Sequence, residues 1–336
     1  MTPTTMKAVR IHTYGGPEIL HYEENVPVPS LKSDDLLIQV RAAAVNPVDW
    51  KIREGGLQNI LHHTLPLTLG WDVSGEVIAI GSEVHEFAIG DTVYARPDIE
   101  RDGAYAEYIA VKASEAARKP AALDFIHAAA VPLTALTAWQ SLVDAAQLQA
   151  GQTVLIHAAS GGVGSLAVQL AKALGAHVIA TASFVNTGLV TQLGADQFID
   201  YTQARFEEVA KNVDVVLDTV GGDTQARSWP VLKPGGILVS IVNPPSEATA
   251  IQHGVRSAFV FIQPSGEQLT AIARLIDEGL IKPVIHTVLP LSAVRQAHAI
   301  SQGGHTRGKI VLQVADSLPT RSFTHGPHGL PRTDGS

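Results

Sequence analysis

The sequence predicts an α/β protein in which a parallel, doubly wound sheet is joined to a smaller, mostly β domain. Two observations predict this division. Up to about residue 119, short apolar runs alternate with Gly, Pro and Asp, which is typical of strands joined by turns. From Phe125 onward, apolar strands alternate with helical stretches, which is typical of a parallel sheet. A length of 336 residues also suits two domains.

The first domain is expected over residues 1–124 and to consist mainly of antiparallel strands. Its clearest strand candidates are the apolar runs over 36–41, 73–78 and 91–94, which are separated by residues that favour turns. This spacing predicts a compact β domain.

The second domain is expected over residues 125–262 and begins with a helical stretch over 128–146. Strand–helix units follow this stretch. The expected strands cover 153–158, 177–181, 213–218, 237–241 and 258–262, and the expected helices cover 165–174 and 189–193. The alternation predicts the doubly wound sheet.

The C-terminal part of the chain is expected to return to the first domain over residues 263–315. It contains an amphipathic helix over 267–278 and a strand over 308–313. Residues 316–336 are rich in Pro, Gly, Ser, Thr and His, and they predict a disordered tail.

The composition excludes several classes of function. The chain has no cysteine, so disulfides, thiolate catalysis and cysteine-ligated zinc or iron–sulfur sites are excluded. A net charge of −8 argues against nucleic acid as a partner, because nucleic-acid binding rests on Lys and Arg. No apolar run reaches the roughly 18 residues of a membrane span, and the N-terminal residues lack the pattern of a secretory signal. We therefore expect a cytoplasmic protein that does not enter a membrane.

A glycine-rich loop, AASGGVG over residues 158–164, follows a strand and precedes a helix. The pattern A-x-G-x-x-G in this context is typical of a dinucleotide-binding turn. Gly161 would let the backbone approach the pyrophosphate, and Gly164 would let helix and strand pack closely. The helix N-terminus would present N–H groups to the phosphates. The loop therefore predicts cofactor contacts at Ser160, Gly161, Gly162, Val163 and Gly164, and the alternative is a plain strand–helix turn.

The residues after the second strand favour NADPH over NADH. An NAD enzyme usually carries an acid about 20 residues beyond the loop, where it binds the ribose 2′-OH. Here the sequence reads ATASFVN over 180–186, and the first acid is Asp196. Thr181 and Ser183 could donate hydrogen bonds to a 2′-phosphate, although no Lys or Arg lies nearby in sequence.

Taken together, the motifs resemble the zinc-independent quinone and enone oxidoreductases of the medium-chain dehydrogenase/reductases. Besides the loop, the resemblance rests on VNPVDWK (45–51), GWDVSGEV (70–77), GDTV (90–93), GAYAEY (103–108), PLTALTAW (132–139), IDY (199–201) and GKIV (308–311). It implies a GroES-like β domain, a Rossmann domain, an active site in the cleft between them, and a homodimer joined through the strand over 258–262.

The resemblance also implies cofactor contacts and the lack of a metal. Where zinc-dependent relatives have Gly-His-Glu, this chain has Gly70, Trp71 and Asp72, so the catalytic zinc site is not expected. A lysine often found just after Ser183 is also missing. The implied contacts are Ser183, Tyr201 and Val220 at the adenosine end, and Thr137, Asn243, Phe261 and Gln263 near the nicotinamide.

Without a metal to polarise a carbonyl, the enzyme would need an electron-poor acceptor such as a quinone or an α,β-unsaturated ketone or aldehyde. Three residues that the resemblance places at the cleft are catalytic candidates. Lys51 could donate to the developing oxyanion, Asn46 could bind substrate or a loop, and Asp49 could orient Lys51 or a water. Alternatively, Asp49 and Lys51 form a surface pair and Asn46 is a turn residue.

The aromatic residues Trp50 and Tyr105 either line an apolar pocket or belong to the core. The hypothesis at this point is NADPH-dependent, zinc-independent reduction of a quinone or enone. The alternatives are an alcohol or carbonyl dehydrogenase of the same superfamily and a dinucleotide-binding protein without catalytic activity.

Overall fold

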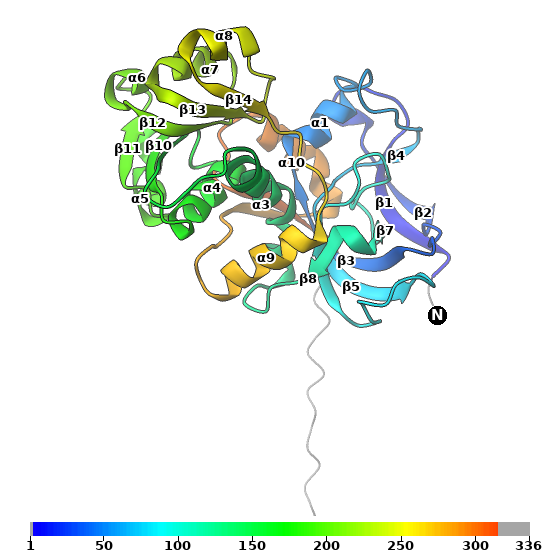
Figure 1. Ribbon diagram of the computed structural model, residues 1–336. Coiled ribbons are helices and arrows are strands. Elements are labelled where there is room, and N and C mark those ends of the chain that lie inside the picture. The colour runs from blue at the N-terminus through cyan, green and yellow to red at the C-terminus, as the bar shows by residue number, and fades with distance from the viewer. Residues whose placement is uncertain (1–2, 315–336) are drawn as a thin grey trace, which may run out of the picture.

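The computed structural model describes residues 3–314 and shows two domains, each with its own sheet and hydrophobic core (Figure 1). The tail predicted over 316–336 lies outside the described residues. Across 3–314, the helices are all too short or too polar to span a membrane.

The Rossmann domain contains a six-stranded parallel sheet, as the sequence predicts. Its strands are β9 (Thr153–Ile156), β10 (His177–Ala182), β11 (Gln197–Asp200), β12 (Val213–Asp218), β13 (Leu232–Ser240) and β14 (Arg256–Phe259). The spatial order is β11-β10-β9-β12-β13-β14, and every neighbouring pair is parallel. The order reverses between β9 and β12, where the C-terminal ends of parallel strands form a ligand site.

Helices cover both faces of this sheet, because alternate strand residues face opposite sides. Val154 and Ile156 pack with one set of helices, whereas Leu155 packs with the other. The first set is α3 (Pro132–Trp139), α4 (Gly162–Ala173), α5 (Thr187–Gln192) and α9 (Gly266–Asp277), and the second is α6 (Phe206–Val209), α7 (Gly222–Ser228) and α8 (Glu247–His253).

The GroES-like domain is a seven-stranded, mostly antiparallel sheet with a smaller three-stranded sheet beside it. The large sheet contains β3 (Asp35–Val45), β5 (Val73–Ile80), β6 (Thr92–Ala95), β7 (Tyr108–Lys112), β8 (Ala116–Arg118), β15 (Ile285–Pro290) and β16 (Lys309–Gln313). The small sheet contains β1 (Thr5–Ile11), β2 (His21–Pro27) and β4 (Leu67–Thr68). The remaining helices are α1 (Pro47–Arg53), α2 (Phe125–Ala129) and α10 (Val294–Gln302).

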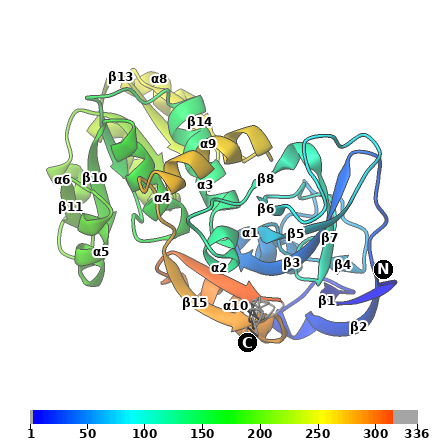
Figure 2. The same ribbon diagram turned by 90° about the horizontal axis from the view of Figure 1, so that it is seen from below.

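The C-terminal segment completes this domain, since β16 pairs with β3 (Figure 2). The buried face of α9, formed by Leu269, Ile272 and Ile276, packs in a hydrophobic cluster with α3 and α4. α9 also contacts β8, so it lies where the two domains meet.

The helical stretch expected over 128–146 is divided in the structure. α2 ends at Ala129, α3 begins at Pro132, and a π-helical segment covers Gln140–Ala145. Proline has no backbone N–H, so it suits the first turn of a new helix and interrupts a continuous one. The break places the N-terminus of α3 beside the polar cluster described below.

Candidate cofactor and active site

The glycine-rich loop connects β9 to α4 at the C-terminal edge of the parallel sheet. Gly161 caps α4 in an extended conformation, and a Cβ there would contact only the carbonyl oxygen of Ala158, at 3.3 Å. A Cβ on Gly164 would lie 2.3 Å from the same oxygen and 2.8 Å from the Cα of Ala159. Gly164 thus lets the helix approach the strand, while Gly161 leaves an open surface before the helix N-terminus. Both features suit a pyrophosphate.

The predicted adenosine contacts differ in their accessibility. Tyr201 and Val220 are 55% and 48% exposed, and Ser183 is partly exposed with its hydroxyl accepting a hydrogen bond from Asn186. Thr181 is buried, and its hydroxyl lies 3.1 Å from Nδ1 of His157. The hydroxyl of Thr181 is therefore already hydrogen-bonded inside the domain. Of the two residues, Ser183 is better placed to bind a phosphate.

The side chain of Thr181 points into the domain because its hydroxyl bonds to His157. Nε2 of His157 lies 3.0 Å from the hydroxyl of Ser228, which itself donates to the carbonyl of Thr224. Nε2 is therefore the protonated nitrogen, and Nδ1 accepts from Thr181. Burial lowers the pKa of His157 to about 4, so the ring is neutral at pH 7.

A cation that the sequence analysis missed lies beside the Ser183 loop. Arg307 precedes β16, and its Nη2 donates to the carbonyl of Val185 at 3.1 Å, across 122 positions of the chain. The next residue, Gly308, donates its N–H to the carbonyl of Ser160 at 2.8 Å and forms an isolated bridge with Gly161. The segment before β16 therefore borders both the glycine-rich loop and the loop after β10.

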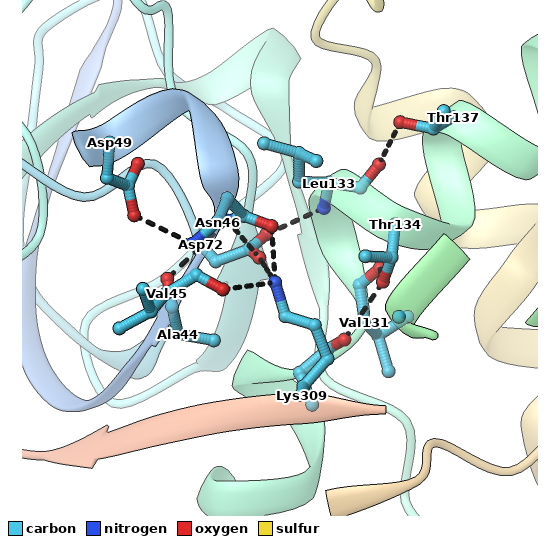
Figure 3. Close-up of polar contacts among 12 residues, drawn as sticks. Ala44, Val45, Asn46, Asp49, Asp72, Val131, Leu133, Thr134, Thr137 and Lys309 are labelled. Atoms are coloured by element: carbon cyan, nitrogen blue, oxygen red, sulfur yellow. Dashed lines mark hydrogen bonds and ion pairs between the residues drawn. The ribbon is translucent and has the colours of Figure 1, made fainter. Parts of the chain in front are cut away.

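A buried polar cluster joins the two domains next to this segment (Figure 3). The ammonium of Lys309 donates to the carbonyl of Val45 and to Oδ2 of Asp72, both at 3.0 Å, and to Oδ1 of Asn46. Lys309 is 5% exposed and Asp72 is fully buried. All three ammonium protons have acceptors, so Lys309 has no proton left for a substrate.

Asp72 extends this cluster to the N-terminus of α3. Its Oδ1 accepts the backbone N–H of Leu133 at 2.6 Å, and its Oδ2 accepts Nδ2 of Asn46 at 2.8 Å. Burial raises the pKa of Asp72, and the ammonium of Lys309 opposes that rise. The carboxylate thus connects the β domain, the C-terminal strand and α3, and the side chain of Asn46 is held among these groups.

Asp49 lies on the inner face of α1, which the sequence analysis did not predict. It forms a capping box with Asn46, accepting its backbone N–H at 2.8 Å, and it accepts the hydroxyl of Tyr105 at 2.7 Å. Burial raises the pKa of Asp49 to about 7, and the bonds from Tyr105 and Asn46 oppose that rise. Asp49 therefore holds the start of α1 in place, and it does not orient Lys51.

The buried chain of hydrogen bonds continues from Tyr105 into α10. Nε2 of His298 lies 3.3 Å from the hydroxyl of Tyr105, and Nη1 of Arg53 lies 3.1 Å from Nδ1 of His298. Arginine only donates, so Nδ1 of His298 accepts and Nε2 carries the proton. This chain ties α1 to α10, and Tyr105 belongs to the core.

The proposed pairing of Asp49 with Lys51 is wrong in both of its forms. Residues two apart on a helix point about 200° apart, so the two side chains lie on nearly opposite faces of α1. Lys51 is exposed, with its ammonium 5.7 Å from the ring centroid of Trp50, whose Nε1 donates to the hydroxyl of Ser301. Asp49 is fully buried, so the two form neither a surface pair nor an orienting pair.

The residues predicted near the nicotinamide lie on three segments, namely α3, the loop after β13 and the segment after β14. Thr137 is buried in α3, and its hydroxyl donates to the carbonyl of Leu133 at 2.6 Å. Phe261 is 43% exposed and Asn243 is exposed. The backbone of Gln263 makes two hydrogen bonds with the side chain of Gln140, which links this segment to the end of α3.

Two family models match the chain. "Alcohol dehydrogenase GroES-like domain" matches residues 32–121, and "Zinc-binding dehydrogenase" matches residues 193–312. A mitochondrial NAD(P)H oxidoreductase of Mus musculus is 36% identical over 93% of this chain and 90% of its own length. A chloroplastic NADPH-dependent alkenal/one oxidoreductase of Arabidopsis thaliana is 38% identical over 92% of this chain and 80% of its own length.

Solved structures agree with these matches. The quinone oxidoreductase from Coxiella burnetii superimposes with a TM-score of 0.84 at 36% identity, covering 92% of this chain and 99% of that one. The similarity therefore extends over both domains.

Proposed function

Because the chain belongs to the quinone and enone oxidoreductases of the medium-chain dehydrogenase/reductase superfamily, we propose that it reduces quinones or α,β-unsaturated ketones and aldehydes with NADPH and without a metal ion. One observation carries the proposal. The glycine-rich loop and the buried polar cluster adjoin, since a Cβ on Gly162 would lie 3.0 Å from Cδ of Lys309. The cofactor loop thus lies directly against the β domain that would hold the substrate.

The residues of the loop suit the pyrophosphate of the cofactor. The N–H groups at the start of α4 would bind the pyrophosphate, and the bare backbone of Gly161 would let it approach. Bound NADPH supplies a hydride. The protein holds the acceptor next to it and provides donors for the oxygen that gains negative charge.

Independence from metal is supported by the groups that fill the polar cluster. The ammonium of Lys309 already bonds to Asp72, Asn46 and the carbonyl of Val45. Trp71, which stands where zinc-dependent relatives have histidine, is buried and donates its Nε1–H to the carbonyl of Arg101 at 3.1 Å. An electron-poor acceptor needs no Lewis acid.

The test of the proposed function is NADPH oxidation with a panel of quinones, enones and saturated carbonyls in the presence of a chelator. We expect turnover of the quinones or enones and none of the saturated carbonyls. Turnover of saturated carbonyls alone, or only after zinc is added, would instead support an alcohol dehydrogenase. NADPH binding without any turnover would support a non-catalytic protein.

The preference for NADPH over NADH is supported by Arg307, which supplies near Ser183 the cation that the local sequence lacks. Charge-assisted hydrogen bonds to a phosphate are among the strong ones. We expect Arg307→Gln to raise the KM for NADPH about 10-fold to 100-fold and to leave the KM for NADH nearly unchanged. Steady-state kinetics with both cofactors measure this.

The matched control is Arg274→Gln, which removes an exposed guanidinium from α9. It should change neither KM. An equal rise of both values in Arg307→Gln would show that Arg307 supports the loop rather than the 2′-phosphate.

We also propose a homodimer joined through the edge strand β14. Among the described residues, β14 pairs with β13 alone, so its other edge is free for backbone pairing. Phe259 and Phe261 are 40% and 43% exposed on or next to this strand. Light scattering after gel filtration should give twice the chain mass, and a monomer at micromolar concentration would contradict the proposal.

A further inference from the structure

Arg96 is a buried guanidinium with unused donors. It is 3% exposed, directly after β6. Its Nη1 donates to the carbonyl of the adjacent Pro97 at 3.2 Å, and its buried Nε has no partner within residues 3–314. Burying a guanidinium is costly unless its N–H groups find acceptors.

The register of β5 and β6 places Arg96 beside the polar cluster. Val73 pairs with Ala95 and Ser74 pairs with Tyr94, so the next position on each strand sets Asp72 opposite Arg96. Directly opposed residues of an antiparallel pair face the same side of the sheet.

That side is the one that meets the Rossmann domain. The hydroxyl of Tyr94 donates to the carbonyl of Leu269 in α9, and Asp72 accepts the N–H of Leu133 in α3. Side chains alternate along an extended chain, and a residue before proline stays extended. Arg96 therefore faces the domain boundary, like Tyr94.

The carboxylates around Arg96 are all bonded to other groups. Asp72 is bonded to Lys309, and Glu115 and Asp98 are bonded to Lys112. Asp49 is bonded to Tyr105 through Oδ2, while its Oδ1 has no partner among the described residues. These four carboxylates act on Arg96 through their charge, and none forms an ion pair with it. They balance the charge of Arg96 without occupying its donors.

The unused donors form a particular shape. Nε–H and the outer N–H of Nη2 lie on one edge of the planar guanidinium, and this edge binds a carboxylate through two parallel hydrogen bonds. A single carbonyl oxygen would use only one of these donors. The free edge therefore matches a carboxylate better than a ketone oxygen.

We propose that Arg96 binds a carboxylate on the substrate, so that the preferred acceptor is an α,β-unsaturated carbonyl compound that carries an acid group, such as an oxo-alkenoate. This inference rests on the proposed function and names the substrate class for the same site. Because Arg96 is 3% exposed, the proposal requires the two domains to part at their boundary before the acid binds.

The experiment compares trans-4-oxo-2-pentenoate with its methyl ester, which has the same enone and no charge. We expect the wild-type enzyme to favour the acid in kcat/KM by about 10-fold to 100-fold, which is the range for a charge-assisted bidentate contact. Arg96→Gln should remove this preference, so that the acid and the ester have similar kcat/KM. Arg96→Lys should recover only part of the preference, because lysine keeps the charge but lacks the two parallel N–H donors of the guanidinium.

The control variant is Arg118→Gln, since Arg118 lies on the neighbouring strand β8 with an exposed side chain bonded to Asp91. It should keep the wild-type preference. Equal wild-type activity on acid and ester would overturn the proposal, and so would an Arg96→Gln variant that loses both activities equally while remaining folded.

A binding measurement separates this inference from the proposed function. 4-Oxopentanoate, the saturated acid, should raise the melting temperature of the NADPH-bound wild-type protein and not that of Arg96→Gln. If no enone or quinone is reduced, the proposed function fails, and the carboxylate site is then judged by this shift alone. If the panel is reduced and the saturated acid shifts neither protein, the carboxylate site fails and the proposed function stands.

Discussion

Replacing Lys309 with methionine should lower the free energy of unfolding by about 3–5 kcal/mol, because removing one partner of a buried ion pair leaves the other charge uncompensated. The partner left behind is Asp72, which is fully buried. Asn46 and the carbonyl of Val45 would lose the same ammonium. Urea denaturation at pH 7, followed by circular dichroism, measures the change.

The deficit of Lys309→Met should depend on pH. Burial raises the pKa of Asp72, and losing the ammonium would raise it further. A carboxyl with a raised pKa binds its proton more tightly in the folded state than in the unfolded state. Folding stability therefore falls as the pH rises above the pKa of Asp in the unfolded chain, which is about 3.9. The deficit should therefore shrink as the pH is lowered towards 4.

Two comparisons show whether the ion pair is responsible. Adding Asp72→Asn to Lys309→Met should recover a large part of the loss, with a coupling of about 1–3 kcal/mol. Lys51→Met, which removes an exposed ammonium, should change stability by less than about 0.5 kcal/mol. A loss below about 1 kcal/mol in Lys309→Met would show that the cluster adds little to stability.

Alanine at Gly164 should reduce NADPH affinity by more than about 100-fold and destabilise the fold by about 1–3 kcal/mol or more. Its Cβ would lie 2.3 Å from the carbonyl oxygen of Ala158 and 2.8 Å from the Cα of Ala159. Both atoms belong to the backbone, so the helix and the strand must separate. Titration of cofactor fluorescence and thermal unfolding of the apoprotein measure the two effects.

Alanine at Gly161 is the matched variant, because its Cβ would contact only the oxygen of Ala158, at 3.3 Å. It should leave the melting temperature of the apoprotein nearly unchanged and still weaken NADPH about 10-fold or more, since the methyl group enters the surface expected to face the pyrophosphate. If Gly161→Ala bound NADPH as tightly as the wild type, the loop would not hold the phosphates in the way proposed.

The elements that the sequence predicted well are those with local patterns. The strands β9, β10 and β12 and the helix α4 form where apolar periodicity places them. The helix α1 was missed because it is one short stretch with few apolar residues, so periodicity is weak. That omission led directly to the wrong pairing of Asp49 with Lys51, which becomes evident only once the segment is known to be helical.

The polar residues that the sequence analysis missed had weak signals. Lys309 begins the otherwise apolar run KIVL of a buried strand, and Asp72 immediately precedes another such strand. A charged residue in such a place hints at a buried partner. Which partner it is depends on how the strands assemble.

The two-domain α/β architecture and the glycine-rich loop could be predicted from the sequence, because a strand, its glycines and the following helix are contiguous in the chain. Which charges meet could not be predicted, because it depends on how distant strands and helices pack. Lys309 reaches Asp72 across 237 positions and Arg307 reaches Val185 across 122, and the unused edge of Arg96 depends on where every nearby carboxylate is already bonded. Hydrogen bonding and burial depend on distances in space, and these arise only when separate strands and helices pack together.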